Sequence, residues 1–213
     1  MRIRHAFGVR RRATRTRHAF GVRRRATRTR HAFGVRVTGG RLGGRRLVAP
    51  RGARTRPTSD RVRESLFAVL GPLDGARVLD LFAGSGALGI EALSRGAAEA
   101  TFVDTAPAAV AAVRRNLDAL DLRADVRRSD ARAFLGNART RARPYDLVLL
   151  DPPYRLAAGL GRELSEAVSA VLKPGGRVVA ESDRRSPLEL ALELLDERRY
   201  GDTIIRIHGS RPT

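Results

Sequence analysis

The feature that most constrains this 213-residue sequence is an apolar run followed by three closely spaced glycines. The run covers residues 78–82, the glycines are Gly84, Gly86 and Gly89, and the segment 87–93 has helical periodicity. This order predicts a strand, a tight turn and a helix, because glycine allows a sharp turn and lets a ligand approach the backbone closely. The first-turn amides of such a helix are expected to face the ligand. Several nucleotide-binding classes share the spacing G-x-G-x-x-G, so it predicts a site without identifying the ligand.

Two carboxylates narrow the choice of ligand. Asp80 lies at the strand end, four residues before Gly84, where it can accept a hydrogen bond from a cationic ammonium group. Asp104 closes a second apolar run 20 residues after Gly84, a spacing at which a carboxylate accepts hydrogen bonds from a ribose diol. A ligand with an amino-acid end and a ribose, such as S-adenosylmethionine, satisfies both. The alternative is that Asp80 only ends a strand and the glycines only form a turn.

A second candidate half-site is the tetrapeptide Asp151-Pro152-Pro153-Tyr154. It follows the apolar run 145–150, which predicts a strand buried on both faces. Because open parallel sheets bind ligands beyond the carboxyl ends of their strands, the tetrapeptide is expected in the same crevice as the glycine turn. The two prolines fix the loop, so that the Asp151 carboxylate and the Pro152 carbonyl can accept the two hydrogens of an amino group, while Tyr154 offers a flat face to a base. The alternative for Asp151 is a strand-end turn residue.

Both motifs resemble those of the S-adenosylmethionine-dependent methyltransferases that act on amino groups. With the segments 56–67 and 79–96 and the late Tyr200-Gly-Asp-Thr203, they resemble the bacterial 16S ribosomal RNA guanine-N2 methyltransferase D family from about residue 37 to 207. The resemblance implies an α/β, Rossmann-like domain whose mostly parallel seven-stranded sheet has an antiparallel final strand. It also implies S-adenosylmethionine as cofactor and a guanine N2 amino group of 16S rRNA, in the small ribosomal subunit or an assembly intermediate, as substrate.

The resemblance assigns further residues to the cofactor. It implies that the turn with Thr58 and Arg61 closes over the methionine end, that Ser85 belongs to the cofactor turn, and that Asp130 meets the adenine amino group. The residues alone leave other roles open, because Arg61 could be an exposed helix charge and Asp130 a helix cap. Thr58 or Ser59 is the expected N-cap of a helix whose buried stripe is Val62, Leu66, Phe67 and Leu70.

The formal charge of +20 is unevenly distributed. Residues 1–36 hold 13 of the 42 basic residues and no acidic one, so the remainder has 29 basic against 22 acidic residues, a formal charge of +7. That balance suits an enzyme acting on nucleic acid. Cysteine is absent and three of the four histidines lie in the N-terminal repeat, so we expect no metal site and no disulfide framework. A reducing cytoplasm is compatible with this composition.

The N-terminal third contains a repeat and a glycine-rich segment. Residues 4–16 recur unchanged at 17–29 and begin again at 30–36, and the arginine-rich repeat cannot supply a core. We expect residues 1–36 to be disordered and absent from the working protein, with a start near Val35; the alternative is an arm that binds ribosomal RNA. Residues 37–56 are expected to form a β-hairpin extension, and residues 57–213 the catalytic domain. Arg41, Arg45 and Arg46 either hold RNA phosphates or form a solvated edge.

The rest of the chain alternates between predicted strands and helices. Helices are expected from Pro107, over 156–172 and over 188–195, with strands at 124–128 and 177–181. Lys173-Pro-Gly-Gly176 is expected to end the second of these helices, and Gly201-Asp202 to turn a hairpin between 198–200 and 203–207. This alternation predicts an α/β domain with a mostly parallel sheet.

Three other functions fit part of the pattern. A DNA adenine-N6 methyltransferase shares the tetrapeptide chemistry, although the chain has no long insertion for a duplex-reading domain. An NAD-dependent oxidoreductase would use the glycine turn but would leave Asp80 and residues 151–154 unexplained. A non-catalytic RNA-binding protein would not bind S-adenosylmethionine. We expect a monomer. We also expect no membrane contact, because no apolar run is long enough to span a bilayer.

Overall fold

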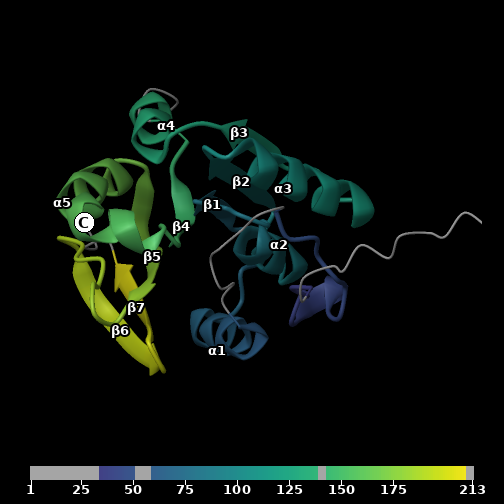
Figure 1. The fold of residues 1–213 in the computed structure, drawn as a ribbon, viewed down its shortest axis with the longest axis horizontal. Coiled ribbons are helices and arrows are strands. Elements are labelled where there is room, and N and C mark those ends of the chain that lie inside the picture. The colour runs from purple at the N-terminus through teal and green to yellow at the C-terminus, as the bar shows by residue number, and fades with distance from the viewer. Residues whose placement is uncertain (1–33, 51–58, 139–142, 210–213) are drawn as a thin grey trace, which may run out of the picture. The chain divides into compact units, whose positions relative to one another are not determined.

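The computed structural model describes residues 34–50, 59–138 and 143–209 (Figure 1). The repeats up to residue 33, the end of the expected extension and Thr58 lie outside the described residues, and the same holds for the side chain of Tyr154.

A seven-stranded sheet runs through the domain in the order β3-β2-β1-β4-β5-β7-β6. Its strands are β1 (Arg77–Leu81), β2 (Glu99–Asp104), β3 (Asp125–Arg128), β4 (Tyr145–Leu150), β5 (Leu172–Asp183), β6 (Glu193–Tyr200) and β7 (Thr203–Gly209). Strands β1 to β5 pair in parallel, and β7 pairs antiparallel with both β5 and β6. The predicted α/β, Rossmann-like fold with an antiparallel final strand is therefore confirmed.

Helices cover both faces of the sheet (Figure 1). The helices are α1 (Asp60–Leu70), α2 (Ala87–Ser94), α3 (Pro107–Ala119), α4 (Ala131–Ala138) and α5 (Tyr154–Ser169), with a short 3-10 helix η1 (Gly40–Leu42) before them. Apolar residues of α1, α2 and α3 share one buried cluster, and those of α4 and α5 share another. In β4, Leu147 and Leu149 join the first cluster while Val148 and Leu150 join the second, as predicted for a strand buried on both faces.

The predicted helix starts are confirmed at α1 and α3. Ser59 is the N-cap of α1, and its hydroxyl accepts a hydrogen bond from the Val62 amide at 3.3 Å. The expected stripe of α1 is buried. Pro107 is the first residue of α3, where its missing N–H removes no helical hydrogen bond.

The helix expected over residues 188–195 is wrong. Residues 187–192 are irregular and β6 begins at Glu193. The Ser165 hydroxyl of α5 accepts a hydrogen bond from the Ala191 amide at 2.8 Å, and a Cβ atom at Gly161 would lie 2.0 Å from the Glu189 carbonyl oxygen. This backbone therefore packs against α5, and the pairing of Glu193 and Leu194 with β7 overrides the local helix propensity.

Element boundaries also differ around residues 154–176. Helix α5 begins two residues earlier than expected and ends at Ser169, three residues earlier. The segment 173–176 lies within β5 instead of ending the helix, because Leu172 pairs with Tyr145 and Arg177 pairs with Leu147. The four intervening residues form a bulge in the strand. The hairpin around Gly201-Asp202 is confirmed.

The N-terminal segment, residues 34–48, is less regular than the hairpin that we expected for residues 37–56. One antiparallel bridge joins Arg36 to Arg46, and η1 occupies the bend between them. Backbone hydrogen bonds from Val37 N to Arg45 O and from Leu47 N to Val35 O hold the two arms together at 2.9 and 2.7 Å. None of the helices in the described ranges is long and apolar enough to cross a membrane.

Candidate active site

The two predicted half-sites lie on neighbouring strands. Leu81, the last residue of β1, pairs with Leu150, the last residue of β4, and the two strands are parallel. The glycine turn follows Leu81 and Asp151 follows Leu150, so both loops leave the sheet at the same edge. The structure therefore brings together the two motifs that the sequence placed in one crevice.

The glycine turn requires conformations that other residues rarely adopt. Gly84 and Gly86 have φ angles of 56° and 79°, in the left-handed region. Phe82, directly before the turn, also has a positive φ of 64°, a strained backbone of the kind that gathers at ligand sites. A Cβ atom at Gly89 would lie 2.4 Å from the Phe102 ring, so only glycine lets α2 pack this closely on β2.

Asp80 is buried beneath the first turn of α2. Its Oδ2 atom accepts a hydrogen bond from the Gly89 amide at 2.9 Å, and the side chain is almost fully shielded from solvent. Burial raises the pKa of Asp80 to about 8, an effect reduced by the Gly89 hydrogen bond and increased by the nearby charge of Asp104. No basic side chain among the described residues pairs with this carboxyl group. A ligand ammonium group would supply the missing positive charge.

Asp104 holds the other side of the turn. Its Oδ2 accepts a hydrogen bond from the Gly84 amide at 2.9 Å, and its Oδ1 accepts one from the Ala106 amide at 2.8 Å. A carboxylate oxygen has room for a second donor, so these bonds leave capacity for a hydroxyl group. The site therefore fits a ligand with three features. Asp80 suits an ammonium group, Asp104 suits a ribose, and the absence of Cβ atoms at Gly84 and Gly86 allows the ligand to approach the backbone closely.

Asp130 caps a helix, one of the two roles that the sequence left open. Its Oδ1 accepts hydrogen bonds from the amides of Arg132 and Ala133, at 2.9 and 3.3 Å, at the start of α4. The side chain is about half exposed at 53%. It follows β3, which pairs in parallel with β2, so it stands at the same edge of the sheet as Asp104. Contact with an adenine stays a prediction.

Asp151 lies in a cluster of carboxylates that the sequence analysis only partly anticipated. Residue Asp151 is half-buried, Pro152 is buried, and Pro153 is the N-cap residue of α5. Burial raises the pKa of Asp151 well above its usual range, and the neighbouring charges of Glu181 and Asp80 raise it further. No donor among the described residues hydrogen-bonds to its carboxylate.

Glu181 is the residue of this cluster that the sequence analysis missed. It is 4% exposed and stands at the end of the apolar run of β5, one residue beyond the pairing of Ala180 with Leu150. In the sequence, Glu181 is only the last residue of the expected strand 177–181. The signal that could have identified Glu181 is its place as an acidic residue at the end of an apolar run. That run pairs with β4, the strand that leads to Asp151.

The remaining candidate residues lie near the surface. Arg61 is exposed on α1, as the alternative reading had it, and Arg41, Arg45 and Arg46 are exposed on the N-terminal segment. Arg45 also donates a hydrogen bond to the Ala119 carbonyl at the end of α3, at 3.3 Å. Contacts of these arginines with cofactor or RNA stay predictions.

The fold and the site together define the class of the protein. The sheet is mostly parallel, with a glycine turn after β1, a carboxylate at the end of β2 and an Asp-Pro-Pro corner after β4. This is the arrangement of a Rossmann-like methyltransferase. The chain belongs to the family described as conserved hypothetical protein 95, whose model matches residues 35–209.

Two curated relatives have specific names. The chain is 42% identical over 186 residues to a putative rRNA methyltransferase of Bacillus subtilis, a match that covers 82% of this chain and 98% of that protein. It is 41% identical over 148 residues to the ribosomal RNA small subunit methyltransferase D of Escherichia coli, covering 68% of this chain and 70% of the relative.

Solved structures agree with the fold. A putative methyltransferase from Escherichia coli superposes with a TM-score of 0.71 at 35% identity, covering 84% of this chain and 99% of that one. A 16S rRNA N2 G1207 methyltransferase of Thermus thermophilus, solved with AdoMet and guanosine, superposes with a TM-score of 0.62 at 25% identity, covering 84% of this chain and 50% of the other.

Proposed function

We propose that this protein methylates the exocyclic N2 amino group of a guanine in 16S ribosomal RNA, with S-adenosylmethionine as methyl donor. The observation that carries the proposal is the pairing of Leu81 with Leu150, which sets the glycine turn beside Asp151. The similarity to relatives named as ribosomal RNA methyltransferases supports the substrate class. The reaction would take place in the cytoplasm, on rRNA or a small-subunit particle.

Residues of the chain divide between the two ligands. Asp80 would hold the ammonium group of the donor, Asp104 its ribose, and the first-turn amides of α2 would face it. Asp130 would meet the adenine, and Thr58 and Arg61 would close over the methionine end. When bound, S-adenosylmethionine supplies a methyl group on a positively charged sulfur.

Asp151 carries the chemistry at the acceptor. An exocyclic amino nitrogen is a poor nucleophile because its lone pair is delocalised into the ring. If the Asp151 carboxylate and the Pro152 carbonyl accept the two amino hydrogens, the nitrogen can become pyramidal and its lone pair becomes available. The nitrogen must then lose a proton as it gains a carbon. Asp151 can hold that proton, since a carboxylate whose pKa is raised is a stronger base than an ordinary one.

Positioning supplies much of the remaining rate. Well-oriented intramolecular reactions gain roughly 7–11 kcal/mol over their bimolecular counterparts. Pro152 is buried and Pro153 is the N-cap residue of α5, so the corner that presents Asp151 is held by the sheet on one side and a helix on the other. Tyr154 would stack on the base, and Arg41, Arg45 and Arg46 would contact RNA phosphates.

The proposal is tested by the choice of methyl acceptor. Purified protein is incubated with labelled S-adenosylmethionine and, separately, small ribosomal subunits, naked 16S rRNA and double-stranded DNA. We expect label in N2-methylguanine of the RNA in at least one ribosomal sample and none in DNA. Label in N6-methyladenine of DNA would instead identify the adenine-specific alternative.

A further inference from the structure

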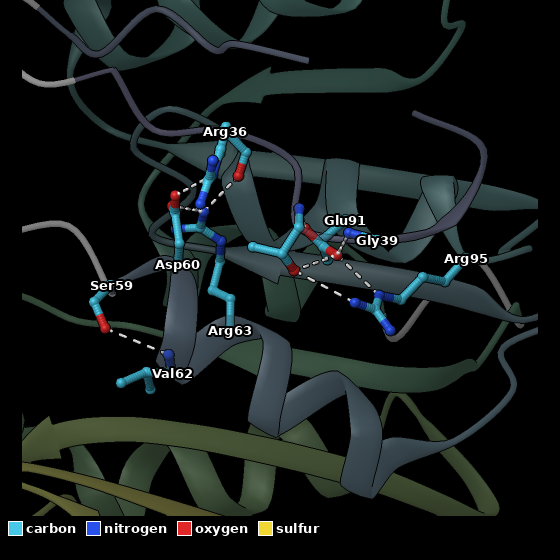
Figure 2. A network of polar contacts seen from close by, with 9 residues as sticks. Arg36, Gly39, Ser59, Asp60, Val62, Arg63, Glu91 and Arg95 are labelled. Carbon is cyan, nitrogen blue, oxygen red and sulfur yellow. Dashed lines mark hydrogen bonds and ion pairs between the residues drawn. The ribbon is translucent and has the colours of Figure 1, made fainter. Parts of the chain in front are cut away.

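The N-terminal segment is attached to the domain by three buried polar side chains. Glu91 and Ser94 lie on α2 and Asn116 lies on α3, and all three are less than 5% exposed. Figure 2 shows the Glu91 part of this attachment, in which the carboxylate accepts hydrogen bonds from the backbone of Gly39 and from Arg95, at 2.8 Å each. The segment is therefore bound by specific polar contacts and not by apolar packing alone.

Among the described residues, the side chains of Glu91 and Ser94 hydrogen-bond to the N-terminal segment and, for Glu91, to the C-cap residue of α2. Ser94 donates from its hydroxyl to the Gly39 carbonyl at 2.6 Å and accepts from the Leu42 amide at 2.9 Å. The partners of Glu91 are Thr38, Gly39 and, one helical turn along, Arg95. Within the described residues neither side chain hydrogen-bonds to the glycine turn, so they fasten the segment to α2.

Asn116 differs because its amide joins the segment to the glycine turn. Its Nδ2 donates to the Val48 carbonyl at 3.0 Å and to the Ser85 carbonyl at 2.9 Å, while its Oδ1 accepts from the Val48 amide at 2.7 Å. Both hydrogens of the amide are used, and exchanging oxygen and nitrogen would set donor against donor at Val48. The orientation of the side chain is thus determined by its partners.

The contact with Ser85 fixes the orientation of one peptide group in the turn. The amide of the same peptide, Gly86 N, donates to the Ala83 carbonyl at 2.7 Å, so the bond from Asn116 holds the carbonyl end of a peptide whose amide end is held within the turn. Both bonds matter because Gly84 and Gly86 are in the left-handed region and glycine has wide backbone freedom. Helix α3 also contacts the glycine turn through Val113, three residues before Asn116. A Cβ atom at Gly86 would lie 3.2 Å from the Val113 side chain. Val113 and Asn116 lie on the same face of α3.

We propose that Asn116 is a positioning residue of the methyl-donor site, and that through it the N-terminal segment forms part of that site. The inference rests on the proposed function in one respect, namely that the turn at 84–86 holds the donor. By pointing the Ser85 carbonyl at α3, Asn116 keeps the peptide between Ser85 and Gly86 in the orientation that the ligand meets. The segment that offers Arg41, Arg45 and Arg46 to RNA then also orders the donor turn.

The test compares Asn116→Ala with Ser94→Ala as a matched control. Both substitutions remove buried hydrogen bonds to the N-terminal segment, but only the first releases the Ser85 carbonyl. We expect Asn116→Ala to raise the KM and Kd for S-adenosylmethionine roughly tenfold, as removing a partner from buried polar groups does, with kcat and the KM for RNA nearly unchanged. Ser94→Ala should lower thermal stability and leave the donor constants within twofold of the parent protein.

Two further measurements keep the proposal open to refutation. Asn116→Asp retains an acceptor for the Val48 amide but, when ionised, offers no donor to Ser85, so it should weaken donor binding as the alanine variant does. Hydrogen exchange of the ligand-free protein should show faster exchange around 84–88 in both Asn116 variants and not in Ser94→Ala. Donor binding and exchange that are the same in all variants would overturn the assignment. Failure of the parent protein to bind the donor would refute the proposed function, while exchange would still decide the role of Asn116.

Discussion

The two halves of the candidate site differ in how far the fold already satisfies their carboxylates. On the side of the glycine turn, Asp80 and Asp104 already accept hydrogen bonds from backbone amides of the chain. On the other side, the carboxylate of Asp151 has no hydrogen-bond donor among the described residues, and burial, with the neighbouring charges of Glu181 and Asp80, raises its pKa. The first half is shaped by the fold before any ligand arrives, whereas the second holds an acceptor that a substrate amino group would satisfy. The difference suggests that donor binding depends on backbone geometry and catalysis on one side chain.

The sharpest way to break this comparison is Asp151→Ala. We expect methyl transfer to fall about 10²–10⁴-fold, the range for loss of a general base, because the amino group loses its main acceptor. Donor binding, measured by isothermal titration, should be retained, since the glycine turn is untouched. Asp125→Ala, which removes an exposed carboxylate on the edge strand β3, is the control and should transfer normally. Normal turnover by Asp151→Ala would refute the role given to this residue.

Gly89→Ala should damage the half of the site that contains the glycine turn and Asp80. The added Cβ would lie 2.4 Å from the Phe102 ring and 3.1 Å from Oδ2 of Asp80, so α2 must move away from the sheet. Overpacking of this kind costs ~1–3 kcal/mol, and we expect a lower melting temperature together with weaker donor binding.

The control for Gly89→Ala is Gly136→Ala in α4. Beyond the helix's own backbone, no atom of the described residues lies within 4 Å of a Cβ atom at that position, so stability should be unchanged or slightly higher. Equal melting temperatures and donor affinities for the two variants would mean that close packing at Gly89 does not shape the donor site.

A third expected effect concerns the proton on Asp80. Its pKa in the folded protein is about 8, above the ordinary value of 3.8, so the folded state binds a proton that the unfolded state has lost between these pH values. The free energy of unfolding should therefore decrease as pH rises from about 4 to about 8. Asp80→Asn should flatten this decrease, as measured by denaturant titration across the pH range.

Donor binding provides a second test of whether Asp80 is protonated in the ligand-free protein. An ammonium group placed beside Asp80 favours the ionised form, so binding near pH 7 should release up to one proton. Calorimetry in two buffers of different ionisation enthalpy measures that release. Equal binding enthalpies in both buffers would show that Asp80 does not change its protonation when the donor binds.

Sequence reasoning succeeded where local chemistry and fold agreed. The strand, glycine turn and helix over 77–94, the Pro107 helix start and the hairpin at 201–202 were all predicted, because glycine, proline and apolar periodicity restrict the backbone locally. It failed at 188–195, where pairing with β7 and packing on Gly161 decide the conformation. Asn116 and Glu91 also escaped notice, since Asn116 bonds to Ser85, 31 residues away, and Glu91 to Gly39, 52 residues away along the chain.

The sequence by itself determined that this chain has a glycine turn, an Asp-Pro-Pro corner and the strands that precede them. Each of these depends on residues that are neighbours along the chain. Only the tertiary structure decided that Leu81 pairs with Leu150, that Glu181 stands beside Asp151, and that Asn116 ties Val48 to Ser85. The physical reason is that burial, shifted pKa values and hydrogen bonds between distant residues arise when the sheet and helices pack. No local stretch of sequence specifies them.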